Sequence, residues 1–204
     1  MTYATRELSV STYPDFEKLA AKGGRGSCWC TAYQRAKPLE GKLSREERKQ
    51  LNRKFKGKAV KEGRSHAALV YDGEVPVGWC QYGTQDELPR IDEWCDSPHL
   101  KYLPPPGEEK LWRITCFYVD RKYREKGVAK AALKAALSSI QSRGGGVVEA
   151  YPVVSKKTGS NPEMLWFGTP SMFEKEGFRR VAPLGRSLVL MRKTIASESY
   201  TGKR

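Results

Sequence analysis

The sequence predicts one α/β domain in which helices flank a mixed β-sheet. In residues 111–143, a run of β-branched and aromatic residues leads through a basic turn into apolar residues at helical spacing. Residues 147–154 follow as another strand, at the distance that a parallel β-α-β crossover requires. Residues 67–71 and 75–82 flank Asp72-Gly73, which predicts an antiparallel hairpin, with a bulge or sheet edge at Pro76. A chain with both kinds of pairing favours a mixed sheet.

The N-terminal part of the chain is expected to add a strand and two helices. Residues 6–11 can form a short strand, and Pro14 suits the first turn of a helix. Ser44-Arg45-Glu46-Glu47 has the spacing of a capping box, which predicts a helix to about Glu62. Its narrow apolar stripe consists of Leu51, Phe55 and Ala59, and Lys and Arg occupy most other positions. We interpret it as a solvated basic helix, with a docking face for an acidic partner as the alternative.

A proline-rich insertion precedes the central strand. Residues 84–109 contain five prolines with aromatic residues between them. A loop of this length within a compact domain is usually functional or disordered, and the aromatic residues favour order. We therefore expect an ordered flap over the substrate side.

The C-terminal part predicts one short helix and a strand pair. Thr169-Pro170 combines a favourable N-cap with proline at the first helical position, and Gly177 ends that helix. Residues 178–182 and 187–192 form the strands. We expect a single domain over residues 1–195 and a flexible tail over 196–204.

Composition bounds the environment and the partners. No run approaches the ~20 apolar residues of a membrane span, and the N-terminus lacks a signal pattern, so we expect a cytoplasmic protein with no membrane partner. The five cysteines show no disulfide framework or paired metal-ligand spacing, so reduced thiols and no metal are expected. The net charge of +14 favours anionic partners without naming one.

The turn at Gly127 has the features of an anion site. The first amides of a helix have no intrahelical partner, and the helix dipole adds partial positive charge there. Gly127 lets a ligand approach the backbone because it lacks a Cβ atom. From spacing alone, an ordinary solvated β-turn-α unit is an equal alternative.

Two motifs resemble those of the GCN5-related N-acetyltransferase (GNAT) superfamily. Residues 124–129, Arg-Glu-Lys-Gly-Val-Ala, resemble its acetyl-CoA signature Arg/Gln-x-x-Gly-x-Gly/Ala, after a strand and before a helix. Residues 172–178 resemble its late helix, which ends in Tyr-Glu-Lys-x-Gly-Phe. The resemblance covers roughly residues 6–193 and implies a mostly antiparallel sheet, acetyl-CoA as co-substrate, and direct attack by a primary amine in a ternary complex.

The resemblance also implies the cofactor-binding residues. The central strand would run along the pantetheine arm and supply a backbone amide to the acetyl carbonyl, here that of Val119 or Tyr118. The loop amides would hold the pyrophosphate. The expected cofactor-binding residues are Phe117, Tyr118, Val119, Arg124, Glu125, Lys126, Gly127, Val128, Ala129, Lys130 and Phe173.

The proton-transfer groups are less defined. The family often uses a late-helix tyrosine to protonate the departing thiolate, but Phe173 stands at that position and cannot donate a proton. Tyr151 and Tyr118 are candidate replacements, although each also suits a structural tyrosine, and a water is another alternative. Glu149, Asp92 and Glu93 are candidate bases, because an amine with a pKa near ~10 must lose a proton before attack.

Two other functions compete with acetyl transfer. The charge and the basic helix suit nucleic-acid binding or an acidic protein surface, although no nucleic-acid-binding signature is present. Because Phe173 cannot donate a proton, a non-catalytic acyl-CoA sensor is the other alternative. Cys28-Trp29-Cys30 lies in the loop that borders the acceptor site in related acetyltransferases, so this loop is expected to contact the acceptor. The acceptor and the oligomeric state stay open.

Overall fold

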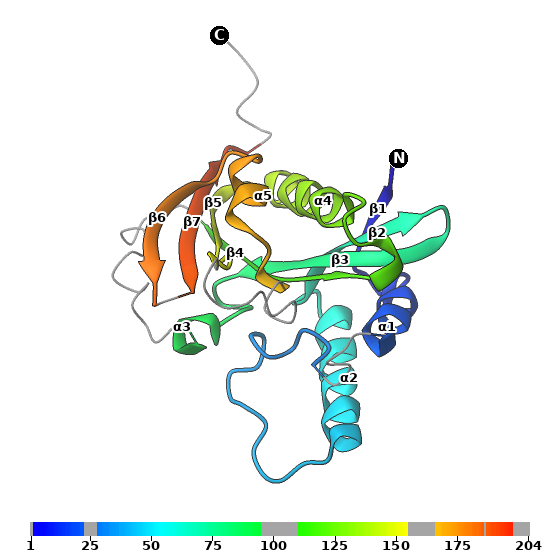
Figure 1. Ribbon diagram of the computed structural model, residues 1–204. Coiled ribbons are helices and arrows are strands. Elements are labelled where there is room, and N and C mark those ends of the chain that lie inside the picture. Colours follow the sequence, from blue (N-terminus) through cyan, green and yellow to red (C-terminus); the bar gives the residue numbers. More distant parts are fainter. Residues whose placement is uncertain (1, 23–27, 95–109, 155–165, 186, 198–204) are drawn as a thin grey trace.

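A seven-stranded sheet with strand order β1-β2-β3-β4-β5-β7-β6 forms the centre of the computed structural model. The structure describes residues 2–22, 28–94, 110–154, 166–185 and 187–197 (Figure 1). In chain order the elements are β1 (Ala4–Glu7), α1 (Tyr13–Lys22), α2 (Arg45–Lys61), β2 (His66–Asp72), β3 (Val75–Thr84), α3 (Ile91–Trp94), β4 (Leu111–Val119), the 3-10 helix η2 (Arg121–Tyr123), α4 (Val128–Ser142), β5 (Gly146–Ala150), α5 (Pro170–Glu174), β6 (Arg179–Leu184) and β7 (Leu188–Ile195).

The sheet is mixed and mostly antiparallel, as the sequence predicted. Strands β4 and β5 pair in parallel, and α4 makes the crossover between them. The other neighbouring strands pair antiparallel. The hairpin at Asp72 is confirmed, and a register shift next to Pro76 confirms the predicted bulge.

Helices cover both faces of the sheet (Figure 1). On one face, α4 and α5 bury Ala132, Ala136 and Phe173 against the strands. On the other face, Phe16 and Leu19 of α1 pack near Trp79 of β3, and α2 lies beside α1.

Strand β4 separates from β5 halfway along its length. Their pairing runs from Leu111↔Val147 to Ile114↔Ala150, whereas β4 continues to Val119 alongside β3. Beyond Ala150 the chain turns towards β7, where Val153 forms a bridge with Leu188. In the same region β4 has a bulge: Gln81 pairs with Cys116 and Tyr82 with Ile114, which leaves Thr115 as the extra residue. The second half of β4 therefore has an edge that β5 does not cover.

Helix α2 confirms one prediction and corrects another. Ser44 accepts a hydrogen bond from the amide of Glu47, whose side chain accepts one from the amide of Ser44, so the capping box is formed. The predicted apolar stripe is wrong at Leu51, which is 42% exposed, whereas Lys56 is fully buried. Lys56 is buried on the side of the helix that faces the sheet, where its ammonium donates a hydrogen bond to Gln34. A hydropathy pattern does not reveal such a partner.

Three predicted segments differ in extent or lie outside the described residues. The first strand covers Ala4–Glu7 instead of residues 6–11, and β5 ends at Ala150 instead of residue 154. Most of the proline-rich insertion and most of the C-terminal tail lie outside the described residues. Among the helices that the structure describes, none has the length and apolar character to cross a membrane.

Candidate functional site

The N-terminus of α4 opens onto free space. Gly127 is its N-cap, with φ of 86° and no side-chain capping bond. A Cβ atom on Gly127 would meet no atom of the described chain within 4 Å. The first regular helical bond runs from the amide of Ala131 to the carbonyl of Gly127, 3.0 Å away, so the amides of Val128, Ala129 and Lys130 precede it and have no intrahelical acceptor. This end of α4 can therefore accept an anion from solvent.

The turn before α4 is held in place from both sides. Asp120 accepts a hydrogen bond from the amide of Lys122 at 3.1 Å and forms a 3.2 Å ion pair with Lys22 of α1. Hydrogen bonding to Lys122 and the Lys22 charge keep the pKa of Asp120 below its usual value. Glu125 has φ of 62°, an uncommon conformation for a residue other than glycine. Such strain persists where the surrounding structure fixes the backbone, as in a preformed binding loop.

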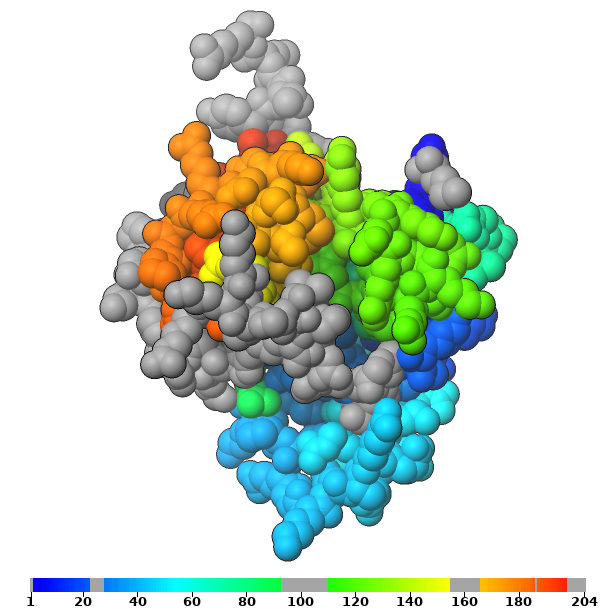
Figure 2. Space-filling model, viewed as in Figure 1, coloured from blue at the N-terminus to red at the C-terminus, as the bar shows by residue number. Residues whose placement is uncertain are grey.

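The loop and the second half of β4 have the kinds of groups that CoA binding requires. The diphosphate needs donors and positive charge, which the α4 amides and the exposed Arg124 and Lys126 supply. The extended pantetheine arm needs a strand edge, which β4 offers beyond Ile114. Figure 2 shows the loop surface (green) and the α5 region (gold) on the same face of the molecule.

The predicted residues of β4 divide between the two faces of the sheet. Phe117 packs against the buried Phe173 of α5, with ring centroids 6.0 Å apart. Tyr118 points to the opposite face and stacks on Trp79 at 4.6 Å. Partial burial, and to a smaller degree the nearby Asp120 charge, raise the pKa of Tyr118, so its hydroxyl keeps its proton.

Glu149 and Tyr151 lie together, apart from Tyr118. Both are fully buried, and the Tyr151 hydroxyl donates to Glu149 Oε2 at 2.9 Å. The other oxygen, Oε1, accepts from Arg192 Nε at 2.8 Å. Another candidate base, Asp92, binds the fully buried Arg113 with a 2.5 Å contact between Oδ1 and Nη2. Side-chain positions are not described for Glu93. The carboxylates of Glu149 and Asp92 thus each already bind an arginine side chain that is buried or partly buried.

The sequence did not predict a buried cluster of two thiols and one amine, formed by Cys30, Cys116 and Lys56. The sulfur atoms of Cys30 and Cys116 are 3.0 Å apart, and Trp79 Nε1 donates to the Cys30 sulfur at 3.3 Å. Lys56 Nζ donates to Gln34 Oε1 at 2.9 Å and lies over the Phe16 ring, 5.2 Å from its centroid. Burial lowers the pKa of Lys56 to about 8. The sequence signal was Cys28-Trp29-Cys30, but its partner is 86 residues away.

Buried polar groups without partners lie beside this cluster. Within the described part of the chain, neither amide atom of Gln81 has a hydrogen-bond partner, although Gln81 is fully buried. Gln81 pairs across the strands with Cys116 at the β4 bulge, and Thr115 Oγ1 is similarly unpaired. Buried polar atoms normally have partners, so such atoms point to a water or ligand that they would bind.

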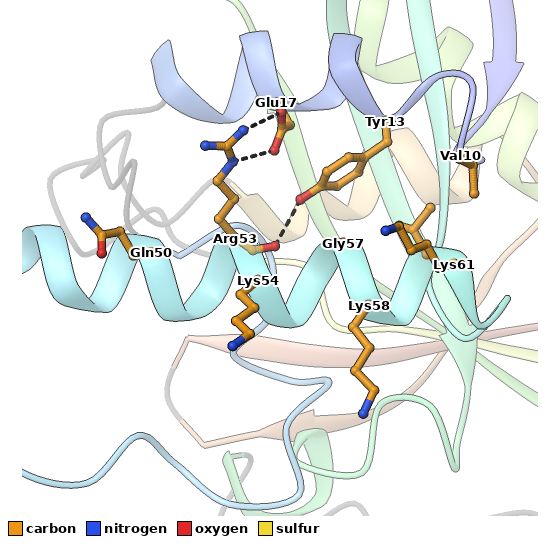
Figure 3. A pocket seen from close by; sticks show the side chains of 10 residues that line it. Val10, Tyr13, Glu17, Gln50, Arg53, Lys54, Gly57, Lys58 and Lys61 are labelled. Atoms are coloured by element: carbon orange, nitrogen blue, oxygen red, sulfur yellow. Dashed lines mark hydrogen bonds and ion pairs between the residues drawn. The ribbon is translucent and has the colours of Figure 1, made fainter.

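A separate hollow of about 730 Å³ lies between α1 and α2. Figure 3 shows Glu17 bound to Arg53, and the Tyr13 hydroxyl donating to the Arg53 carbonyl. Lys54 and Lys58 extend from the same wall. None of the predicted cofactor or catalytic residues lines this hollow. The described residues also contain no group of three or more His, Cys, Asp or Glu placed to hold a metal ion.

The protein is an acyl-CoA-dependent N-acyltransferase that uses acetyl-CoA as co-substrate, as its match with a family model shows. The model of the acetyltransferase (GNAT) family matches residues 28–159. The chain belongs to this family. A search of the curated proteins gives no match.

Solved acetyltransferase structures share the fold at low sequence identity. The PaiA N-acetyltransferase of Thermoplasma acidophilum, in complex with coenzyme A, is 14% identical with a TM-score of 0.53, covering 95% of this chain and 99% of that chain. The ribosomal-protein-S18-alanine N-acetyltransferase of Escherichia coli is 11% identical with a TM-score of 0.51, covering both chains in full, 100% of each. The Corynebacterium glutamicum "histone acetyltransferase HPA2 and related acetyltransferase" is 11% identical with a TM-score of 0.57, covering 98% and 99%. These likenesses establish the fold alone.

Proposed function

We propose that this protein transfers the acetyl group of acetyl-CoA to a primary amine, of a small molecule or a protein, by direct attack in a ternary complex. The observation that carries the proposal is the edge of β4 beyond Ile114, which β5 leaves uncovered next to the open N-terminus of α4. One surface can thus hold the diphosphate and the acyl arm together. We further propose that residues 1–195 form the functional domain.

This geometry supports a role for each of several residues in holding the cofactor. The amides of Val128, Ala129 and Lys130 would hold the diphosphate, and the Arg124 and Lys126 side chains would add full charges beside it. Phe117 and Phe173 would shield the arm on the α4 face, because their rings pack together there. A β4 amide near Tyr118 would stabilise the acetyl oxygen as it gains charge.

The acceptor amine is proposed to enter from the opposite face, where α1 and α2 lie. The unpaired amide of Gln81 faces the same layer as Trp79 and supplies buried polar atoms for a bound group. The loop between α1 and α2 reaches β4 on this face. An amine there would lie beside the acyl end of the arm, which removes an entropic barrier to attack.

Tyr118 is the proposed proton donor to the departing thiolate. It lies on β4, it is partly exposed, and its raised pKa keeps the hydroxyl protonated. Tyr151 remains a second candidate, but its hydroxyl is engaged with the buried Glu149. Tyr118→Phe should lower kcat by ~100-fold, the low end of general acid catalysis, with acetyl-CoA affinity retained. Tyr151→Phe is the matched comparison, and a loss confined to that variant would transfer the role to it.

The test of the function is product formation. Isotope-labelled acetyl-CoA is incubated with a panel of polyamines, amino sugars, and peptides with free N-termini or lysines, and acetylated products are identified by mass spectrometry. An acetylated amine and an intersecting pattern of initial rates would support the proposal. Acetyl-CoA binding without product from any amine class, or a parallel pattern that indicates an acyl-enzyme, would contradict it.

A further inference from the structure

Two cysteines meet across the α1–α2 layer and the central strand. Cys30 lies in the loop before α2, and Cys116 lies on β4, one residue before Phe117. Their sulfur atoms are 3.0 Å apart. Trp29 and Cys30 both have left-handed backbone angles, with φ of 51° and 49°. Two adjacent non-glycine residues in this region indicate that the surroundings hold the loop in place against strain.

The surroundings favour one thiolate within the pair. The hydrogen bond with Cys116, the nearby Lys56 ammonium and the Trp79 N–H lower the pKa of Cys30. The same shared hydrogen bond, followed by burial, raises the pKa of Cys116. One sulfur thus tends to carry the negative charge and the other the proton. A thiolate beside a thiol is the arrangement in which oxidation yields a disulfide.

We propose that Cys30 and Cys116 form a peroxide-sensitive dithiol site, whose disulfide ties the α1–α2 loop to β4 and suppresses acetyl transfer. The Cys30 thiolate attacks one peroxide oxygen, the O–O bond breaks, and hydroxide leaves and takes up a proton as water. The Cys116 sulfur then attacks the Cys30 sulfenic acid, an S–S bond forms, and the S–O bond breaks to release a second water. The two thiols lose two electrons, and hydrogen peroxide is reduced to two waters.

The contact needs little movement to close. An S–S bond is about 2.05 Å long, so the sulfurs must approach by about 1 Å. Cys116 is partly exposed as a residue, whereas Cys30 is buried. Cys28 is a natural comparison for the reactivity of Cys30. It lies two residues away in the chain, but burial raises the pKa of its thiol. Its thiol should therefore react more slowly.

The effect on activity rests on the proposed function, whereas disulfide formation does not. The cross-link would fix the β4 bulge, where Cys116 lies two residues before Tyr118. It would also remove the thiolate that faces Lys56. A strand fixed at this point cannot adjust to an acyl arm and an amine at the same time, so the oxidised protein should transfer acetyl groups more slowly.

The first experiment maps the bond chemically. The full chain is treated with hydrogen peroxide, alkylated under denaturing conditions, digested without reductant and analysed by mass spectrometry. The expected result is a cross-linked peptide pair containing Cys30 and Cys116, reversed by dithiothreitol, in wild type and in Cys28→Ser. A bond from Cys28, or irreversible acids at Cys30 with no cross-link, would overturn the proposal. Wild type alone is sufficient for this readout, so a poorly folding variant does not weaken it.

The second experiment links the bond to activity and to Lys56. Peroxide should lower the acetyl-transfer rate of wild type and Cys28→Ser, with recovery on reduction, and should leave the rate of Cys116→Ser unchanged relative to its own untreated value. Lys56→Met should slow disulfide formation about tenfold at neutral pH, because it removes the ammonium that favours the Cys30 thiolate. A mapped disulfide with full activity would refute the regulatory part alone, and absence of activity in every untreated sample would refute the proposed function instead.

Discussion

Replacing Gly127 with glutamate should cost about twice as much free energy in acetyl-CoA binding as in folding. Gly127 caps α4 at φ of 86°, and a side chain here would project into open space. That space is where the diphosphate is proposed to lie. The substitution therefore places a carboxylate beside the anion site without displacing any atom of the described chain.

The magnitudes separate the two effects. A left-handed angle costs an L-residue about 1–2 kcal/mol, and an acidic residue at a helix N-terminus returns about 0.3–1 kcal/mol, so the net stability loss should be near 1 kcal/mol. Two unit charges 4 Å apart near a surface repel by about 4 kcal/mol. Because the site is exposed to solvent, we halve this repulsion to about 2 kcal/mol. That free energy corresponds to roughly a 30-fold rise in the Kd for acetyl-CoA.

Calorimetric titration with acetyl-CoA measures the binding term, and urea denaturation measures stability. Gly41→Ala is the matched control, because Gly41 has φ of 81° with open space around it and lies outside the α4 loop. This control should lose similar stability and bind acetyl-CoA normally. If Gly127→Glu bound acetyl-CoA within twofold of wild type, the assignment of the diphosphate to this helix end would be wrong.

Three further predictions concern buried charge and capping. Burial lowers the pKa of Lys56 to about 8, below the ~10.4 of the unfolded chain, so the unfolded state binds more protons between these two values. The free energy of unfolding of wild type, measured in urea melts relative to Lys56→Met, should therefore rise by about 2.5 kcal/mol between these pH values. Asp92→Asn should lower the free energy of unfolding by about 2–3 kcal/mol, because the substitution leaves the buried Arg113 charge without its carboxylate partner. Glu174→Gln, in an exposed ion pair, should lower the free energy of unfolding far less, and equal losses in the two variants would contradict this reasoning. Ser44→Ala should cost about 1 kcal/mol in denaturant melts by removing one half of the capping box, and no loss would show that the cap is dispensable.

The local features of the fold were predictable because they depend on neighbouring residues. The capping box at Ser44, the hairpin at Asp72 and the strand-to-helix turn at Gly127 all involve groups within a few positions of each other. Hydrogen bonding of this range is specified by residue type and spacing alone. The mixed sheet followed from combining a hairpin with a crossover helix. The assignments of cofactor and proton-transfer residues stay predictions until binding and turnover are measured.

Burial on the basic helix was not predictable in the same way. Periodicity assigned α2 an apolar stripe through Leu51, but the structure leaves that side chain exposed and buries Lys56. A buried ammonium is tolerated only where polar or charged groups interact with it. The groups that interact with Lys56, Gln34 and Cys30, come from another segment of the chain. The sequence lists these groups without indicating that they converge.

The sequence by itself thus determined the class of fold, the strand-to-helix turn at Gly127 and the resemblance to an acetyltransferase, and it predicted an anion site at that turn. Only the tertiary structure placed Cys30 against Cys116, joined Tyr151 to Glu149, and separated β4 from β5 beyond Ile114. The physical reason is range: helix caps and turns form from contacts along the chain. A thiol pair 86 residues apart forms only when the packing of two layers on one sheet brings the segments together.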